Sequence, residues 1–169
     1  LPDAAGFVNA NFFDRQGEVL GLLISDGVRY GSAYRDRGGI FYTIGDEIGI
    51  RSTVNEPYAG EAYDQAVQAF PMLISGGEAA FSSQAADRAS RRTVIGIDGS
   101  GRVMLIVSSS LIGMRLTDLS AYLTTAGLDL VEAVNLDGGG STLLAINGTR
   151  IPSFDPVPAV LAFYPKDAP

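Results

Sequence analysis

The segment of residues 135–141, Asn-Leu-Asp-Gly-Gly-Gly-Ser, carries the residue types best suited to chemistry in this sequence. Apolar runs adjoin it on both sides, which predicts a tight turn between two strands instead of a flexible linker. Three glycines leave no side chains in the way, so backbone N–H groups can point at an anionic ligand. We predict a functional site here, and the alternative is a purely structural turn. The candidate site residues of this turn are Asn135, Asp137, Gly138, Gly139, Gly140 and Ser141.

The composition restricts the chemistry that such a site can perform. The chain has no His and no Cys, which excludes a Ser-His-Asp triad, a thiol nucleophile, disulfides and zinc sites built on His or thiolate. Acid–base catalysis then depends on carboxylates, Lys, Tyr or water. The acidic loops show no calcium-loop spacing. We therefore predict neither a metal site nor a cofactor.

The net charge and the hydropathy bear on partners and location. A net charge of −7 repels phosphate backbones at long range, so we expect no nucleic-acid partner, although a local Arg can hold a small phosphorylated ligand. No apolar run reaches the length of a membrane span. The chain begins with Leu1-Pro2 and no Met. We expect a processed, soluble protein that is secreted or resides in the cell envelope.

Two segments distant from the glycine turn add candidate residues. In residues 9–14, Asn-Ala-Asn-Phe-Phe-Asp, the two Phe side chains are expected to fill the core. Asn9 is a candidate ligand-binding residue, and its alternative role is a buried amide that ties backbone together. Arg92, which opens a strand at 93–97, has a planar fork suited to phosphate or carboxylate. Its alternative role is a solvated surface charge.

The elements that must position these residues predict an α+β fold. Residues 1–169 are expected to form a single, sheet-rich domain with two main helices packed on a mixed β-sheet. One helix is predicted over 61–70, since its apolar residues recur at helical spacing, and the other over 117–127, with Thr117 as its cap. Hairpins are predicted over 40–50 and 93–107.

The order of these motifs resembles that of the phosphodiester glycosidase family. The first segment, 9–13, resembles the family's Asn-Gly-Gly-Phe-Phe element, and residues 92–96, Arg-Thr-Val-Ile-Gly, resemble its Arg-Thr-Ala-Ile-Gly. Residues 135–141 match the family signature at every position. The resemblance spans residues 6–164. Ser108, Ser109 and Ser110 stand where the family's uncovering enzyme has an acidic Asp-Gly loop.

The resemblance implies a hydrolase that cleaves the glycosidic bond of a sugar-1-phosphodiester. Arg92 and the amides of the glycine turn would hold the phosphate, and Asp137 would be the nucleophile or base. Such cleavage usually needs two carboxyl groups. We select Asp14 as the second, over Asp26, Glu78 and Asp98. The alternative function is a non-catalytic module that binds an envelope polysaccharide or a sugar phosphate, and a second carboxyl group within reach of Asp137 separates the two.

Overall fold

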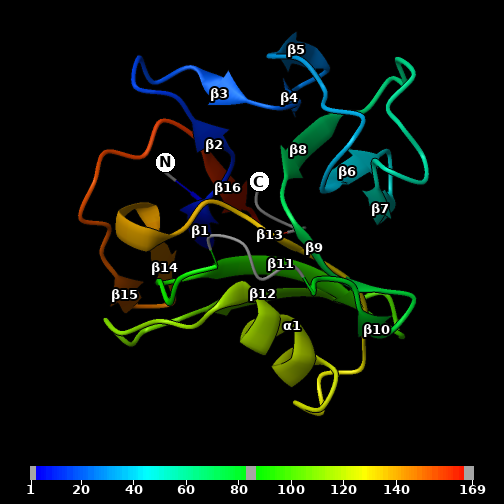
Figure 1. Cartoon of the computed structure of the whole chain (residues 1–169). Helices are drawn as coiled ribbons and strands as arrows, with labels where there is room; N and C mark the ends of the chain where they lie inside the picture. The colour runs from blue at the N-terminus through cyan, green and yellow to red at the C-terminus, as the bar shows by residue number, and fades with distance from the viewer. Residues whose placement is uncertain (1–2, 83–86, 166–169) are drawn as a thin grey trace.

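The structure is a computed structural model that describes residues 3–82 and 87–165 of the chain. These residues form one α-helix and sixteen strands, which are arranged in four sheets (Figure 1). Every strand pair is antiparallel. Helices in the described part of the chain lack the length and apolar character needed to cross a membrane.

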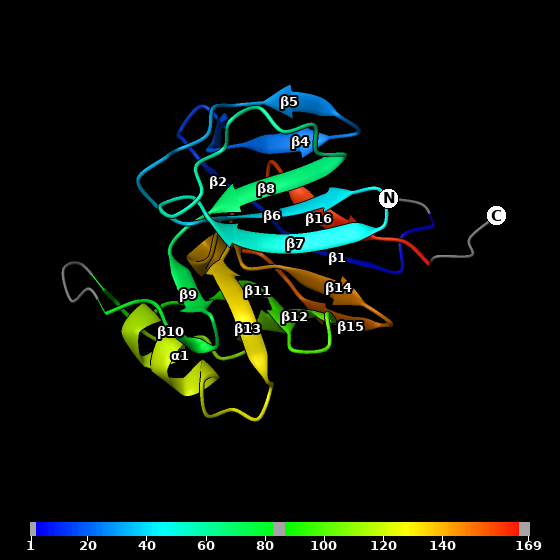
Figure 2. The ribbon, with the colours of Figure 1, turned by 90° about the vertical axis from the view of Figure 1, so that its right-hand side faces the viewer.

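One five-stranded sheet has the order β5-β4-β8-β6-β7 and forms the upper part of Figure 2. Its hairpin of β6 and β7 confirms the prediction over 40–50, because apolar residues flank a Gly-Asp turn. The strands are β4 (Leu23–Ser25), β5 (Val28–Tyr30), β6 (Gly39–Ile44), β7 (Glu47–Ser52) and β8 (Gln65–Ala69).

The second five-stranded sheet has the order β10-β9-β13-β11-β12, and helix α1 (Leu116–Leu123) packs on one face. The hairpin of β11 and β12 confirms the second predicted hairpin. Strand β13 lies in the middle of this sheet and leads into the glycine turn. The strands are β9 (Met72–Ser75), β10 (Glu78–Ala79), β11 (Thr93–Asp98), β12 (Val103–Val107) and β13 (Leu130–Asn135).

A four-stranded sheet of order β15-β14-β1-β16 and a two-stranded pair, β2 with β3, complete the described chain. Val8, Val67 and Val134, one from each large sheet, are buried in one apolar cluster that joins the three sheets. The strands are β1 (Gly6–Asn9), β2 (Phe12–Phe13), β3 (Val19–Leu20), β14 (Leu144–Ile146), β15 (Thr149–Ile151) and β16 (Val160–Phe163).

The expected α+β class with two helices on a mixed sheet is wrong, because the described chain is mostly β. Residues 65–69 of the predicted first helix form the central strand β8, between β4 and β6. The apolar residues of this segment fit helical spacing, yet both faces of β8 are covered, so its burial follows no alternation. Gln68 is fully buried, and its side chain bonds to the backbone of Leu22 and Tyr34. Non-local pairing outweighs the local pattern here.

The second predicted helix exists but is shorter and capped differently. It ends at Leu123, and its N-cap position is Arg115, which makes no side-chain cap bond. The Asp87 carboxylate caps it from a distance, accepting hydrogen bonds from the amides of Leu116 and Thr117 at 2.8 and 3.0 Å. A carboxylate beside a helix N-terminus is stabilised by the unpaired N–H groups there.

Candidate active site

The glycine turn connects β13 of one five-stranded sheet to β14 of the four-stranded sheet. The Leu136 amide still bonds to the sheet of β13, donating to the Thr93 carbonyl at 2.9 Å. The chain leaves this sheet at Asp137, whose amide donates to the Ala10 carbonyl at 3.1 Å. A 3-10 turn, η1 (Gly139–Ser141), then leads to β14, which pairs with β1. The candidate carboxylate of Asp137 therefore lies where the ends of β1 and β13 converge.

Most backbone amides of the turn are already bonded within the protein. The Gly138 amide donates to the carboxylate of Asp137 at 2.8 Å, and the Gly139 amide donates to the Arg91 carbonyl at 2.8 Å. Ser141 closes the 3-10 turn by donating to the Gly138 carbonyl at 3.1 Å. Within the described residues the Gly140 N–H has no acceptor. Of the three glycine amides predicted to bind an anion, this one is available.

Glycine occupies each of the three positions of the turn for a different structural reason. A Cβ at Gly138 would lie 2.7 Å from the Arg91 carbonyl oxygen, which is closer than real side chains approach. Gly139 has φ +63°, the left-handed region that favours glycine. A Cβ at Gly140 would overlap the carboxylate of Asp155. The run of glycines therefore serves close packing of the turn against two other segments.

Asp137 is half-buried, and its surroundings favour the protonated form. Burial raises the pKa of Asp137 and outweighs the hydrogen bonds from the Ser141 hydroxyl and the Gly138 amide, which lower it. The negative charge of Asp155 raises the pKa further. A raised pKa makes a carboxyl group a better candidate for a proton donor.

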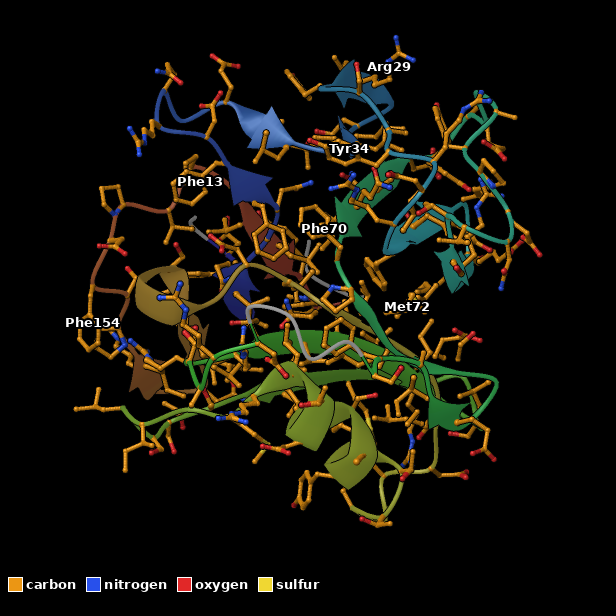
Figure 3. All side chains as sticks on the ribbon, viewed as in Figure 1. Phe13, Arg29, Tyr34, Phe70, Met72 and Phe154 are labelled. Atoms are coloured by element: carbon orange, nitrogen blue, oxygen red, sulfur yellow. The ribbon has the colours of Figure 1, made fainter. Side chains whose placement is uncertain are left out.

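Two asparagines hold the turn in place. Asn9 is fully buried, and its Nδ2 donates to the Asp137 carbonyl at 2.5 Å. The Asn9 Oδ1 accepts from the Thr93 hydroxyl at 2.7 Å and from the Leu143 amide at 3.0 Å. Asn135 donates from Nδ2 to the Phe70 carbonyl at 3.0 Å, beside the aromatic side chain marked in Figure 3. Both contacts match the backbone-tying role weighed for Asn9, and they bring Asn9 and Asn135 to the turn.

Arg92 is held elsewhere. Its Nε donates to the Met114 carbonyl at 2.9 Å, and its Nη2 donates to the Arg88 carbonyl at 2.6 Å. The same Nη2 lies 3.8 Å from the Asp87 carboxylate. Burial lowers the pKa of Arg92, against the effect of Asp87. The guanidinium thus belongs to the network at the start of α1, although the Arg92 backbone lies beside Gly138.

Asp14 lies in the turn between β2 and β3. Its Oδ1 accepts hydrogen bonds from the amides of Gln16 and Glu18 at 2.9 and 3.0 Å. Within the described residues no hydrogen bond connects Asp14 to the glycine turn. The carboxylate that lies against the glycine turn, at Gly140, is instead that of Asp155, in the segment between β15 and β16, and its negative charge acts on Asp137.

Nearly the whole chain matches one family in sequence. The profile of the family "Phosphodiester glycosidase" matches residues 3–164. The chain belongs to the phosphodiester glycosidase family. The 135–141 turn, the buried Asn9 and strand β11 meet at the end of β13, whereas the Arg92 side chain lies elsewhere.

Solved structures share this fold of the phosphodiester glycosidase family. The zebrafish N-acetylglucosamine-1-phosphodiester alpha-N-acetylglucosaminidase catalytic domain, auto-inhibited by its pro-peptide, superimposes with a TM-score of 0.72 at 23% identity over 97% of this chain. A hypothetical protein from Synechocystis superimposes with a TM-score of 0.58 at 17% identity over 94% of it. This chain spans 64% and 50% of the lengths of those two chains. No curated protein sequence matches it significantly.

Two residues at the turn, Arg91 and Asp155, are absent from the sequence-based candidates. Strand alternation could have indicated Arg91: Thr93 points inward to Asn9, and the residue two positions earlier shares that face, whereas Arg92 does not. Asp155 carries no comparable signal, because its loop has no periodicity. Among the described residues, no group of three or more carboxylates is placed to hold a metal ion.

Proposed function

We propose that this chain hydrolyses the glycosidic bond of a sugar-1-phosphodiester, with Asp137 as the proton donor. The observation that carries the proposal is the half-buried Asp137 carboxyl group on the signature turn of a phosphodiester glycosidase, where burial raises the pKa of Asp137 above its ordinary value. An ionised Asp137 would suit the nucleophile or base role expected from the resemblance. The raised pKa favours the donor role instead.

The proposed reaction breaks the bond between the anomeric carbon and the bridging phosphate oxygen. Water attacks the anomeric carbon, the bridging oxygen leaves with the phosphate, and the Asp137 proton moves to that oxygen. The products are the free sugar and a phosphomonoester. Since phosphate is already a good leaving group, anion binding and stabilisation of the sugar cation matter as much as the proton.

The proposed phosphate-binding group is the Gly140 N–H, which has no acceptor within the described residues. It lies in η1, where the free N–H of a short turn can bind an anionic oxygen. Arg92 does not contact the phosphate in this proposal, because its guanidinium is bonded to the Met114 and Arg88 carbonyls. A direct Arg92–phosphate contact would require those bonds to break.

The experiment compares a sugar-1-phosphodiester with a neutral glycoside of the same sugar. We expect wild type to cleave the phosphodiester faster, and Asp137→Asn to lose that activity. Asp46→Asn is the matched control, since Asp46 is an exposed carboxylate in the β6–β7 turn. Faster cleavage of the neutral glycoside would reassign the substrate. Binding of the phosphodiester without cleavage would indicate a binding module.

The role of Arg92 is tested with the same pair of substrates. Arg92→Ala should reduce kcat/KM on both by a similar factor, because the lost side chain supports the start of α1. A selective loss on the phosphodiester, about tenfold or more, would identify Arg92 as a direct phosphate ligand.

A further inference from the structure

The segment that carries Asp155 is fastened to the glycine turn through its backbone. The amides of Phe154 and Asp155 both donate to the Gly140 carbonyl, at 2.7 and 3.1 Å. Figure 3 marks Phe154 at the outer side of the 3-10 turn. Two successive amides on one carbonyl fix the position of Asp155 relative to the turn, although residue 155 itself is exposed to solvent.

Arg91 also holds the segment that carries Asp155, through hydrogen bonds from its buried side chain. It is 5% exposed, and its Nη2 donates to the Thr142 carbonyl at 3.1 Å and to the Pro152 carbonyl at 3.0 Å. Its guanidinium lies 4.6 Å from the centre of the Phe154 ring. Among the ion pairs of residues 3–82 and 87–165, none includes Arg91. This buried cation therefore joins the chain after the turn to the chain before Asp155.

Gly140 supplies the space that the Asp155 carboxylate occupies on the glycine turn. A Cβ at this position would overlap the Asp155 carboxylate, so only glycine allows Asp155 its present place. The φ of Gly140 is outside the left-handed region, which means that backbone conformation alone does not require glycine there. The residue is needed for the approach of Asp155. The negative charge of Asp155, held on the turn, also raises the pKa of Asp137.

We propose that Asp155 is the second carboxyl group of the hydrolytic site, the base that activates water, and that Arg91 and Gly140 position it. This inference rests on the proposed function. Asp155 is suited to the role because it is open to the solvent from which the water comes, whereas Asp137 is half-buried. The two environments separate an acid from a base, as in other paired-carboxylate sites.

The two carboxyl groups account for both proton transfers of the proposed reaction. Asp155 accepts a proton from water, and the oxygen of that water bonds to the anomeric carbon. The bond from that carbon to the bridging oxygen breaks, and the leaving oxygen takes the Asp137 proton. Asp155 is then protonated and Asp137 ionised, and exchange with solvent restores both.

The decisive experiment uses Asp155→Ala with and without sodium azide on a sugar-1-phosphodiester. We expect kcat to fall by about a hundredfold or more, and azide, which needs no base, to restore cleavage with glycosyl azide as product. Asp14→Ala, assayed in parallel, compares the other candidate carboxylate. Asp155→Ala activity within about threefold of wild type, or a loss that azide does not relieve in a folded variant, would overturn the assignment.

The positioning roles of Gly140 and Arg91 are tested by measuring kcat and KM of their variants. Gly140→Ala should displace the Asp155 carboxylate and lower kcat, and Arg91→Lys should do the same by loosening the 152–155 segment. Azide should restore part of the activity in both variants, which a purely structural defect would not allow. Inactive wild type would refute the proposed function itself, whereas active wild type with an unaffected Asp155→Ala refutes only this inference.

Discussion

Two Asp-Gly turns of the same sheet have opposite electrostatic environments. In the β11–β12 turn, the Asp98 carboxylate accepts hydrogen bonds from the Ser100 amide and hydroxyl and from the amide and Nε of Arg102, at 2.6 to 2.9 Å. These bonds hold the pKa of Asp98 well below its usual range. At the end of β13, burial and a neighbouring carboxylate raise the pKa of Asp137.

The contrast teaches that the Asp-Gly dipeptide does not determine the role of the carboxylate. Asp98 is saturated with donors, so its charge is stabilised and it serves the turn. Asp137 accepts from the Gly138 amide and the Ser141 hydroxyl, which do not offset its burial. A carboxyl group that is incompletely satisfied within the fold retains the capacity to react with a substrate.

The largest expected difference between the two turns is in catalysis. Asp137→Asn should lower kcat/KM by about 10²–10⁴-fold, the usual contribution of a general acid, and change the free energy of unfolding by less than about 1 kcal/mol. Asp98→Asn should keep the activity of its folded fraction. Initial rates and thermal unfolding of both variants check this. A destabilised Asp137→Asn would make Asp137 a structural anchor like Asp98.

For stability, the larger effect is expected at Asp98 and the smaller one at Asp137. Asp98→Ala removes the acceptor for four hydrogen bonds and should lower Tm by several degrees. Asp137→Ala loses fewer contacts and should lower Tm less. Calorimetry at neutral pH ranks the two variants. An equal or smaller Tm loss for Asp98→Ala would remove the distinction between the turns.

The glycines of the two turns allow a matched pair of variants. Gly139 and Gly101 have φ of +63° and +84°, and a Cβ would meet only the Ser90 hydroxyl, at 3.3 Å, in the first case and nothing within 4 Å in the second. Alanine should cost about 1–2 kcal/mol at either site. Only Gly139→Ala should reduce kcat/KM. Comparable activity in both variants would mean that the geometry of the 135–141 turn is not needed for the reaction.

The smallest expected effect is in the pH dependence of stability, where the signs are opposite. Since folding raises the pKa of Asp137 above its ordinary 3.8, its contribution to stability is greatest below that value and is lost as pH rises through the folded pKa. Since folding lowers the pKa of Asp98, its contribution is present above 3.8 and is lost as pH falls. Between about pH 3 and about pH 6, the free energy of unfolding should therefore rise more steeply with pH in Asp137→Asn than in wild type. An unchanged slope would contradict the raised pKa.

The sequence predicts the local elements of this protein better than their arrangement. Both hairpins and the strands around the glycine turn could be predicted, because their turns and apolar runs are local signals. The strand at 65–69 could not, since its pairing with β4 and β6 involves residues distant in sequence. For the same reason Asp14 could be selected by its motif, whereas Asp155 becomes visible only when its segment lies on Gly140.

The bond that breaks is the most direct test of hydrolysis at the sugar. Wild type is incubated with a sugar-1-phosphodiester in water labelled with oxygen-18, and the phosphomonoester product is analysed by mass spectrometry. Attack at the anomeric carbon, with Asp137 protonating the bridging oxygen, predicts a phosphomonoester free of label. Label in the phosphomonoester would mean that water attacks phosphorus, which would contradict glycosidic cleavage at the Asp137 turn.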